Sequence, residues 1–165
     1  MKIGIAGCGG IGSNVACHLV RTGIDYLKFG NQVGLYKSET LAKNLKEINP
    51  NGIFDFEIIK FDRNNIKDFF SNCDIVVEAF DKKEFKAMLI EELLPMGKII
   101  VSASGIGHWD TENIRTKEIG KNLIIAGDFE KDTDEYKTYS HKVGIVAAIM
   151  AGKVLEKGGY LWEKE

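Results

Sequence analysis

A glycine-rich turn between a short apolar strand and a helix constrains this chain more than any other feature. Residues 2–6 have the pattern of a buried strand, and Gly7-Cys8-Gly9-Gly10-Ile11-Gly12 follows directly. After the turn, apolar residues recur at helical spacing, at Ile11, Val15, Leu19 and Val20. A turn in this setting is typical of a Rossmann-type nucleotide site, because the exposed N–H groups at the start of the helix attract a phosphate.

Three glycines of the turn have separate physical roles in such a site. Gly7 permits the tight turn, Gly9 lets a phosphate approach the backbone, and Gly12 lets the helix pack closely on the strand. A merely tight turn is the simpler interpretation. The position of the turn between strand and helix favours nucleotide binding.

Strand and helix patterns alternate along the rest of the chain. Further strands are predicted at residues 26–29, 54–61, 74–79, 98–103 and 123–126. Helices are predicted at residues 41–48, 66–70, 85–93 and 143–155, whereas residues 105–121 are polar and irregular. This alternation predicts one α/β domain of the Rossmann type over residues 1–157, with a mostly parallel sheet and helices on both faces. Residues 158–165 are predicted to form a mobile tail.

Composition narrows the classes of function. The 165 residues suffice for one domain, and a net charge of −2 lacks the basic excess of proteins that bind nucleic acid. The longest apolar run, residues 143–151, is far shorter than the roughly 20 residues that cross a bilayer, and we see no export leader. The three cysteines form no Cys-x-x-Cys pair. We therefore expect a cytoplasmic protein that binds neither nucleic acid nor a membrane.

The end of the second predicted strand bears on which nucleotide is bound. Dinucleotide dehydrogenases usually place an acidic residue there to bind the ribose. Here the strand ends Lys28-Phe29-Gly30, and Asp25 lies at its opposite end. This pattern counts against a nicotinamide cofactor, although an NAD-dependent oxidoreductase stays an alternative.

Several further motifs resemble those of one enzyme family. They are the glycine turn extended through Ser13-Asn14, Gln32-Val33-Gly34-Leu35-Tyr36-Lys37, Ile48-Asn49-Pro50, Val76-Val77-Glu78-Ala79-Phe80-Asp81, Ser102-Ala103-Ser104-Gly105 and Gly127-Asp128-Phe129. With them the sequence resembles the ThiF/MoeB family of adenylyltransferases, in its short ThiF-like form. The resemblance implies an enzyme that uses ATP and Mg²⁺ to activate the C-terminal glycine of a ubiquitin-like sulfur carrier protein, for thiamine or a related sulfur cofactor. It also implies a homodimer.

The resemblance assigns roles to individual residues. It implies that Gly7, Gly9, Gly10 and Gly12 hold the nucleotide together with Asn14. It also implies that Lys37 contacts the phosphates, that Asp81 binds the magnesium ion, and that Lys86 approaches the phosphates. From the residues alone, Asp81 and Glu84 form an Asp-x-x-Glu pattern that favours a helix cap, and Lys37 is an ordinary solvated lysine. Both interpretations of Asp81 stay open at this point.

The chain departs from the family pattern after Gly30. The family has an acidic residue for the ribose there and then an Asn-Leu-x-Arg-Gln stretch that faces the phosphates, whereas Gly30 here runs directly into Asn31-Gln32-Val33. No cysteine follows Cys73, so thioester or persulfide chemistry is not expected. A non-catalytic relative that binds nucleotide or carrier therefore remains an alternative to the enzyme.

Overall fold

The computed structural model describes residues 1–31 and 35–160, with the backbone alone for residues 35 and 36. The strands are β1 (Ile3–Ala6), β2 (Tyr26–Asn31), β3 (Ile53–Ile58), β4 (Ile75–Glu78), β5 (Ile99–Ala103), β6 (Arg115–Ile119) and β7 (Leu123–Gly127). The α-helices are α1 (Gly10–Arg21), α2 (Leu35–Ile48), α3 (Ile66–Phe69), α4 (Lys83–Leu93) and α5 (Ser140–Lys157), and a 3₁₀ turn, η1, spans Leu94–Met96.

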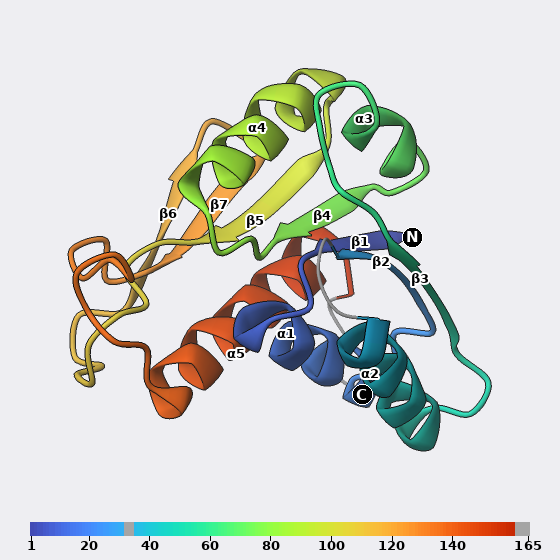
Figure 1. Cartoon of the computed structure of the whole chain (residues 1–165), viewed down its shortest axis with the longest axis horizontal. Helices are drawn as coiled ribbons and strands as arrows, with labels where there is room; N and C mark the ends of the chain where they lie inside the picture. Colours follow the sequence, from blue (N-terminus) through green and yellow to red (C-terminus); the bar gives the residue numbers. More distant parts are fainter. Residues whose placement is uncertain (32–34, 161–165) are drawn as a thin grey trace.

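The seven strands form one sheet in the order β3-β2-β1-β4-β5-β7-β6, and only β6 runs antiparallel to its neighbour. Helices α1, α2 and α5 cover one face of the sheet, whereas α3 and α4 cover the other (Figure 1). Strand β1 has β2 as its neighbour on one side and β4 on the other. The connections after these strands therefore run in opposite directions, and a topological switch point lies at the carboxyl end of β1. The predicted Rossmann-type, single-domain α/β fold is confirmed.

Two apolar clusters fill the space between sheet and helices. The larger cluster lies between the sheet and α1, α2 and α5, with Ile5, Val15 and Val146 fully buried in it. The smaller cluster includes Phe61, Phe69 and Phe70, whose ring centroids lie 4.7 to 5.5 Å apart. A side chain at Gly30 would overlap Phe61, which packs over the end of β2. Burial of this apolar surface fixes the strand ends where the loops of the site begin.

Several sequence-based boundaries are wrong, and helix α2, for one, begins at Leu35 rather than at residue 41. Residues 105–121 contain strand β6, which has few apolar residues because it is the exposed edge of the sheet. Helix α5 begins at Ser140 rather than at residue 143, since its polar first turn carries the buried Lys142. Strand β3 ends at Ile58, and Phe61 beyond it belongs to the core.

The predicted domain limit at residue 157 coincides with the end of α5. Residues 158–160 continue from that helix, and the Tyr160 N–H donates to the carbonyl oxygen of Leu155 at 3.0 Å. The remainder of the predicted mobile tail, residues 161–165, lies outside the described residues. The limit and the mobility of the tail therefore stay predictions. Within the described ranges, no helix is both long enough and apolar enough to cross a membrane.

Candidate functional site

The glycine turn is shaped by two positions where only glycine fits. Gly7 has a φ of +100°, and a Cβ there would lie 2.5 Å from the carbonyl oxygen of Ala79. A Cβ at Gly12 would overlap the carbonyl oxygen of Gly7, so helix α1 begins in direct contact with the strand that precedes it. The Gly7 N–H also donates to the carbonyl oxygen of Gly30 at 2.8 Å, which ties the turn to the end of β2.

Gly9 differs from those two glycines because the fold does not require it. A Cβ at Gly9 would meet only Oδ1 of Asp81, at 3.8 Å, and its φ of −76° is ordinary for any residue. Gly9 is the N-cap of α1, no side chain caps this end, and the first turn carries no acidic residue. The end of the helix therefore presents backbone N–H groups to an open space, as an anion site requires.

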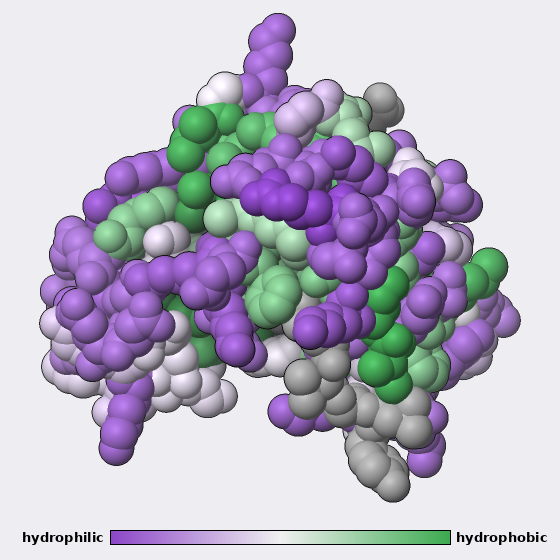
Figure 2. Space-filling view, turned by 45° about the horizontal axis from the view of Figure 1, so that its top comes forward, coloured by the Kyte–Doolittle hydropathy of each residue, from purple (hydrophilic) through white to green (hydrophobic). Residues whose placement is uncertain are grey.

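Two cavities meet at the carboxyl ends of β1 and β4. The glycine-turn cavity, of about 510 Å³, reaches from Gly7 and Gly9 to Asn31 at the end of β2. The loop cavity, of about 610 Å³, lies beneath residues 132–138 and against the start of α5. Figure 2 shows that one face of the molecule is hollowed near its centre, with apolar side chains inside a hydrophilic rim.

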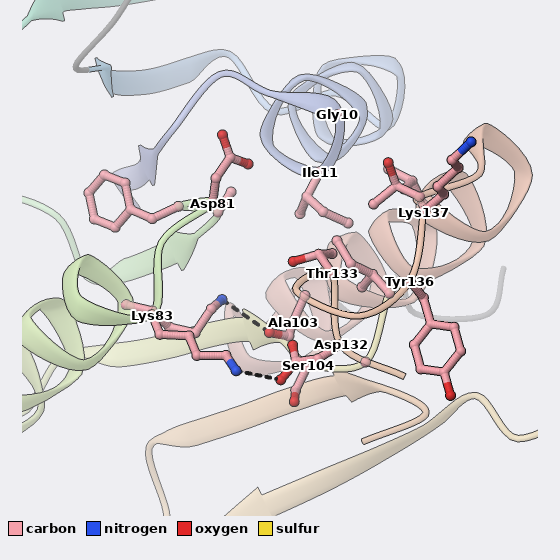
Figure 3. Close-up of a pocket in the computed structure, with 17 residues that line it drawn as sticks. Gly10, Ile11, Asp81, Lys83, Ala103, Ser104, Asp132, Thr133, Tyr136 and Lys137 are labelled. Atoms are coloured by element: carbon pink, nitrogen blue, oxygen red, sulfur yellow. Dashed lines mark hydrogen bonds and ion pairs between the residues drawn. The ribbon is translucent and has the colours of Figure 1, made fainter. Parts of the chain in front are cut away.

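Asp81 lines both cavities, together with Ala79 and Phe80. Figure 3 shows its carboxylate directed toward the start of α1, across the cavity from Thr133 and Tyr136. Asp81 is exposed, and no hydrogen bond or ion pair joins its carboxylate to another described residue. This carboxylate is therefore available to ligands in either cavity.

The helix-cap interpretation of Asp81 is wrong. Helix α4 begins at Lys83, and its N-cap position is Lys82, which makes no side-chain cap bond. The chain stays extended through Lys82, with φ of −97° and ψ of 134°, so Asp81 lies one residue too early to cap the helix.

A buried carboxylate holds the lysine at the floor of the loop cavity. Glu78 is fully buried at the end of β4 and accepts hydrogen bonds from the Phe80 N–H at 2.8 Å and the Ser102 hydroxyl at 2.6 Å. The Lys86 ammonium forms an ion pair with the same carboxylate and donates to the carbonyl oxygen of Ala103 at 3.0 Å. Lys86 therefore lines the loop cavity, where its charge is already neutralised, and not the glycine-turn cavity.

A second buried ion pair holds the loops that cover the loop cavity. The Lys142 ammonium, fully buried in the first turn of α5, donates to Oδ2 of Asp128 at 2.5 Å and to the carbonyl oxygen of Gly107 at 2.7 Å. Oδ1 of Asp128 accepts from the N–H groups of Glu130 and Lys131, both at 2.9 Å. Burial opposes ionisation of Asp128, but the Lys142 ammonium and these N–H groups outweigh it and lower the pKa of the carboxyl group.

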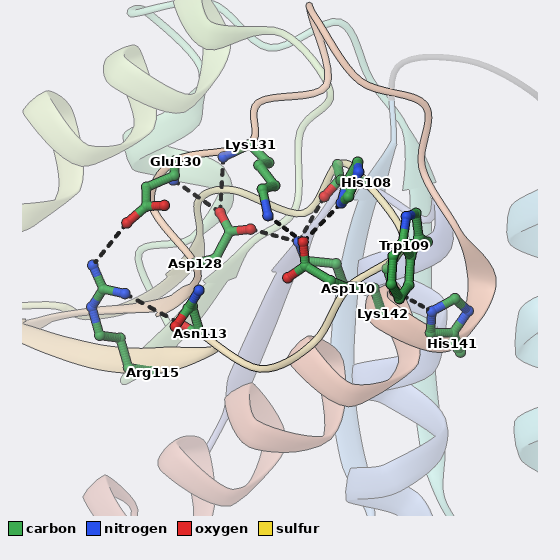
Figure 4. Close-up of polar contacts among 11 residues, drawn as sticks. His108, Trp109, Asp110, Asn113, Arg115, Asp128, Glu130, Lys131, His141 and Lys142 are labelled. Atoms are coloured by element: carbon green, nitrogen blue, oxygen red, sulfur yellow. Dashed lines mark hydrogen bonds and ion pairs between the residues drawn. The ribbon is translucent and has the colours of Figure 1, made fainter.

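The same loops carry a more exposed polar cluster (Figure 4). Asp110 accepts from the Lys131 ammonium and lies 2.8 Å from Nδ1 of His108. The hydrogen bond from Lys131, and then that from His108, lowers the pKa of Asp110. His108 has a φ of +68°, unusual for a residue with a side chain, and its ring packs edge-on against Tyr136. Through Lys131 and Tyr136, these contacts fasten the loop of residues 132–138, which roofs the cavity, to His108 and Asp110.

The structure brings some of the predicted site residues together. Gly7, Gly9, Lys37 and Asp81 line the glycine-turn cavity. Gly10 lines the loop cavity, and Gly12 lies in direct contact with the carbonyl oxygen of Gly7 in the turn. Asn14 is turned away, because its amide donates to the carbonyl oxygen of Gly10 at 2.7 Å. The proposed ligand contacts of these residues stay predictions, and residues 32–34 of the Gln32–Lys37 motif lie outside the described residues.

Sequence reasoning missed four residues of the site. Lys60 lines the glycine-turn cavity. Glu78 forms an ion pair with Lys86, and Asp128 forms a separate buried ion pair with Lys142. Glu78 and Asp128 did carry a signal, since each is an acid at the end of an apolar strand, where burial demands a partner. Nothing in the sequence around Lys60 or Lys142 marks these lysines.

Two curated proteins share part of the sequence. The adenylyltransferase and sulfurtransferase UBA4 of Candida glabrata is 27% identical over 124 residues, which covers 64% of this chain and 29% of that protein. The adenylyltransferase and sulfurtransferase MOCS3 of Xenopus laevis is also 27% identical over 124 residues, covering 64% of this chain and 27% of its own. The chain thus spans less than a third of these relatives. No protein-family model matches the sequence.

Solved structures with the same fold cover almost the whole chain. The ATP complex of E. coli tRNA N6-threonylcarbamoyladenosine dehydratase, TcdA, has a TM-score of 0.80 at 20% identity and covers 98% of this chain and 88% of its own. HcgE of Methanothermobacter marburgensis, bound to guanylylpyridinol and ATP, has a TM-score of 0.76 at 14% identity and covers 96% of both chains. At these identities the likeness establishes the fold.

Proposed function

We propose that the chain is an ATP-dependent adenylyltransferase of the ThiF/MoeB family, which it resembles in sequence and in fold. Its acceptor in this proposal is the C-terminal glycine carboxylate of a ubiquitin-like sulfur carrier protein, in thiamine or related sulfur-cofactor biosynthesis in the cytoplasm. One observation carries the proposal. The carboxylate of Asp81, which no other described residue engages, lies between a cavity at the glycine turn and a second cavity of similar size.

The glycine-turn cavity is suited to the nucleotide. The open N–H groups of α1 and the positive end of its dipole attract a phosphate, and Gly9 leaves room for it. Lys37 and Lys82 add two exposed ammonium groups to the same cavity. TcdA and HcgE, which share this fold, have each been solved with ATP.

The loop cavity is suited to the acceptor tail. It opens next to Asp81 and is roofed by residues 132–138, so an extended peptide end in it points toward the glycine turn. In the reaction, a carboxylate oxygen of the tail attacks the α-phosphorus of ATP. The bond from that phosphorus to the bridging oxygen breaks, pyrophosphate leaves, and an acyl-adenylate forms. The chain contributes mainly position and charge, because little covalent chemistry is required of the protein.

Asp81 fits a magnesium ion in chemical terms. Magnesium prefers oxygen ligands and usually takes one or two protein carboxylates together with phosphate oxygens and water. No group of three metal-ligating side chains exists among the described residues, so the phosphates would supply the other ligands. When bound, the ion neutralises the charge that develops on the phosphates. Asp81 would hold the ion, and Lys37 would orient the outer phosphates.

Carrier-dependent exchange of labelled pyrophosphate into ATP tests the proposal. We expect exchange with a carrier from the same organism, and a loss of at least about 100-fold in Asp81→Asn. Asp25→Asn is the matched control, because Asp25 is also exposed but lies before β2, at the opposite end of the sheet. Failure with every such carrier, or tight NADH binding without ATP binding, would contradict the proposal.

A binding protein without turnover is the second candidate. The observation that favours it is the direct join of Gly30 to Asn31, which lacks the arginine-containing stretch of the family. This candidate predicts that the carrier binds but that no pyrophosphate is exchanged. In either case we expect a homodimer, which sedimentation of the purified protein measures.

A further inference from the structure

The far end of the glycine-turn cavity lies at the end of β2. The cavity extends from Gly7 and Gly9 to Asn31, the last residue of that strand. In Rossmann-type sites the 5′-phosphate lies on the glycine turn and the ribose reaches the end of the second strand. An acidic residue there accepts hydrogen bonds from the ribose hydroxyls, whereas a basic residue there accommodates a phosphate on the ribose.

No carboxylate lies at this end of the cavity among the lining residues that the structure describes. The sequence contains no aspartate or glutamate from Tyr26 to Ser38, so no acid in β2 or in the connection to α2 reaches the ribose. Lys37, Lys60 and Lys82 line the cavity, and Asp81 is the one acidic residue among the described residues of its lining. Asp81 lies at the other end, next to Gly9. The charge at the ribose end is therefore positive.

Lys60 is held beside the end of β2 by the backbone. The N–H of Ile59 donates to the carbonyl oxygen of Asn31 at 3.0 Å, which places the next residue, Lys60, next to that strand end. Its side chain is exposed and lines the cavity. Within the described part of the chain, no hydrogen bond, ion pair or ring contact engages the Lys60 ammonium. This cation is available to a ligand.

We infer that the ribose end of this cavity accepts a phosphate, so that the site takes a nucleotide phosphorylated on its 2′- or 3′-hydroxyl as well as on its 5′-carbon. The inference rests on the proposed function, which places the 5′-phosphate at the glycine turn. Lys60 is the principal contact for the added phosphate, and Lys37 reinforces the positive field around it. A ribose hydroxyl alone finds no carboxylate acceptor here, so its presence has little effect on affinity.

Calorimetric titration of the full chain at low ionic strength tests this inference. The probes are 5′-AMP, 2′-deoxy-5′-AMP, adenosine 2′,5′-bisphosphate and adenosine 3′,5′-bisphosphate. We expect one or both bisphosphates to bind roughly threefold to tenfold more tightly than 5′-AMP, an advantage that shrinks as salt is added. We expect the dissociation constant of the deoxy nucleotide to lie within about twofold of that of 5′-AMP, because no buried protein group loses a hydrogen bond when the hydroxyl is absent.

Substitution of Lys60 assigns the effect to its ammonium group. Lys60→Gln removes the preference for the bisphosphate over 5′-AMP. Lys121→Gln is the matched control, because Lys121 is an exposed lysine in the turn between β6 and β7 at the opposite edge of the sheet. This control retains the preference.

The outcomes separate the inference from the proposed function. If 5′-AMP binds and neither bisphosphate binds more tightly, the inference is overturned and the nucleotide site stands. A preference that survives in Lys60→Gln also overturns it. If neither 5′-AMP nor ATP binds, the proposed nucleotide site itself is contradicted.

Discussion

The glycine-turn side of the candidate site is built from backbone, whereas the loop side depends on side-chain ion pairs. On the turn side, Gly7 and Gly12 bring two backbone segments into contact, and hydrogen bonds to the neighbouring strands complete the structure. On the loop side, the buried pair Lys142–Asp128 fastens two loop segments to α5. The comparison teaches that the two sides of one site respond to different perturbations, the first to added volume and the second to lost charge.

The largest expected effect is on the turn side. Gly12→Ala places a Cβ onto the Gly7 carbonyl oxygen, a backbone atom that has nowhere to move, so we expect a loss of more than about 4 kcal/mol in the free energy of unfolding. Gly144→Ala is the control, because a Cβ in that part of α5 meets nothing within 4 Å. There alanine stabilises the helix by up to about 1 kcal/mol. Urea unfolding measures both, and equal stability of the two variants would show that the turn has more room.

The loop side is tested by removing one partner of its buried pair. Lys142→Met leaves Asp128 charged, buried and without its cation, which costs about 3 to 5 kcal/mol of unfolding free energy. The double variant Lys142→Met with Asp128→Leu removes both charges, and we expect it to recover much of that loss. Urea unfolding compares the two. A double variant as unstable as the single one would mean that the N–H contacts of Asp128 matter more than the ion pair.

Acid is expected to destabilise the loop side more than the turn side. The pKa of Asp128 and that of Asp110 are lowered in the folded chain, so their contribution to stability is present above the unfolded pKa of about 4. That contribution is lost as the pH falls through the lower folded values. Asp110→Asn should make the fall of unfolding free energy between pH 5 and pH 3 shallower. Thermal unfolding across this range measures it, and an unchanged slope would contradict the expectation.

The smallest effect on stability is expected at Gly9. Alanine fits there without a clash, so Gly9→Ala should change the unfolding free energy by less than about 1 kcal/mol. The added methyl group projects where the phosphate would lie, and we expect the affinity for ATP to fall at least about tenfold. Calorimetric titration with ATP, beside urea unfolding, tests whether stability and binding separate. Unchanged affinity would place the phosphate elsewhere.

The turn side could be predicted from the sequence because its geometry is local. Gly7 and Gly12 are a few residues apart, and the strand and helix that flank them have clear apolar patterns. Asp81 was singled out through resemblance, and the capping pattern misled because it assumes that the helix starts at the next residue. The chain instead stays extended through Lys82, a backbone choice that no residue type in the pattern dictates.

The loop side could not be predicted because its contacts join distant residues. Lys142 lies in a helix whose first turn is polar, and only the fold shows that Asp128 and Gly107 surround its ammonium. Strand β6 escaped prediction for a related reason. An edge strand exposed to water needs few apolar residues, so residues 115–119 have the pattern of a loop.

The place of Asp81, in the wall common to both cavities, has a thermodynamic consequence. A ligand that changes the charge or orientation of this carboxylate in one cavity alters the free energy of binding in the other. Linkage makes that coupling reciprocal, so the first ligand changes the affinity of the second by the same factor as the second changes that of the first. The free energy of the ternary complex is therefore the same whichever ligand binds first.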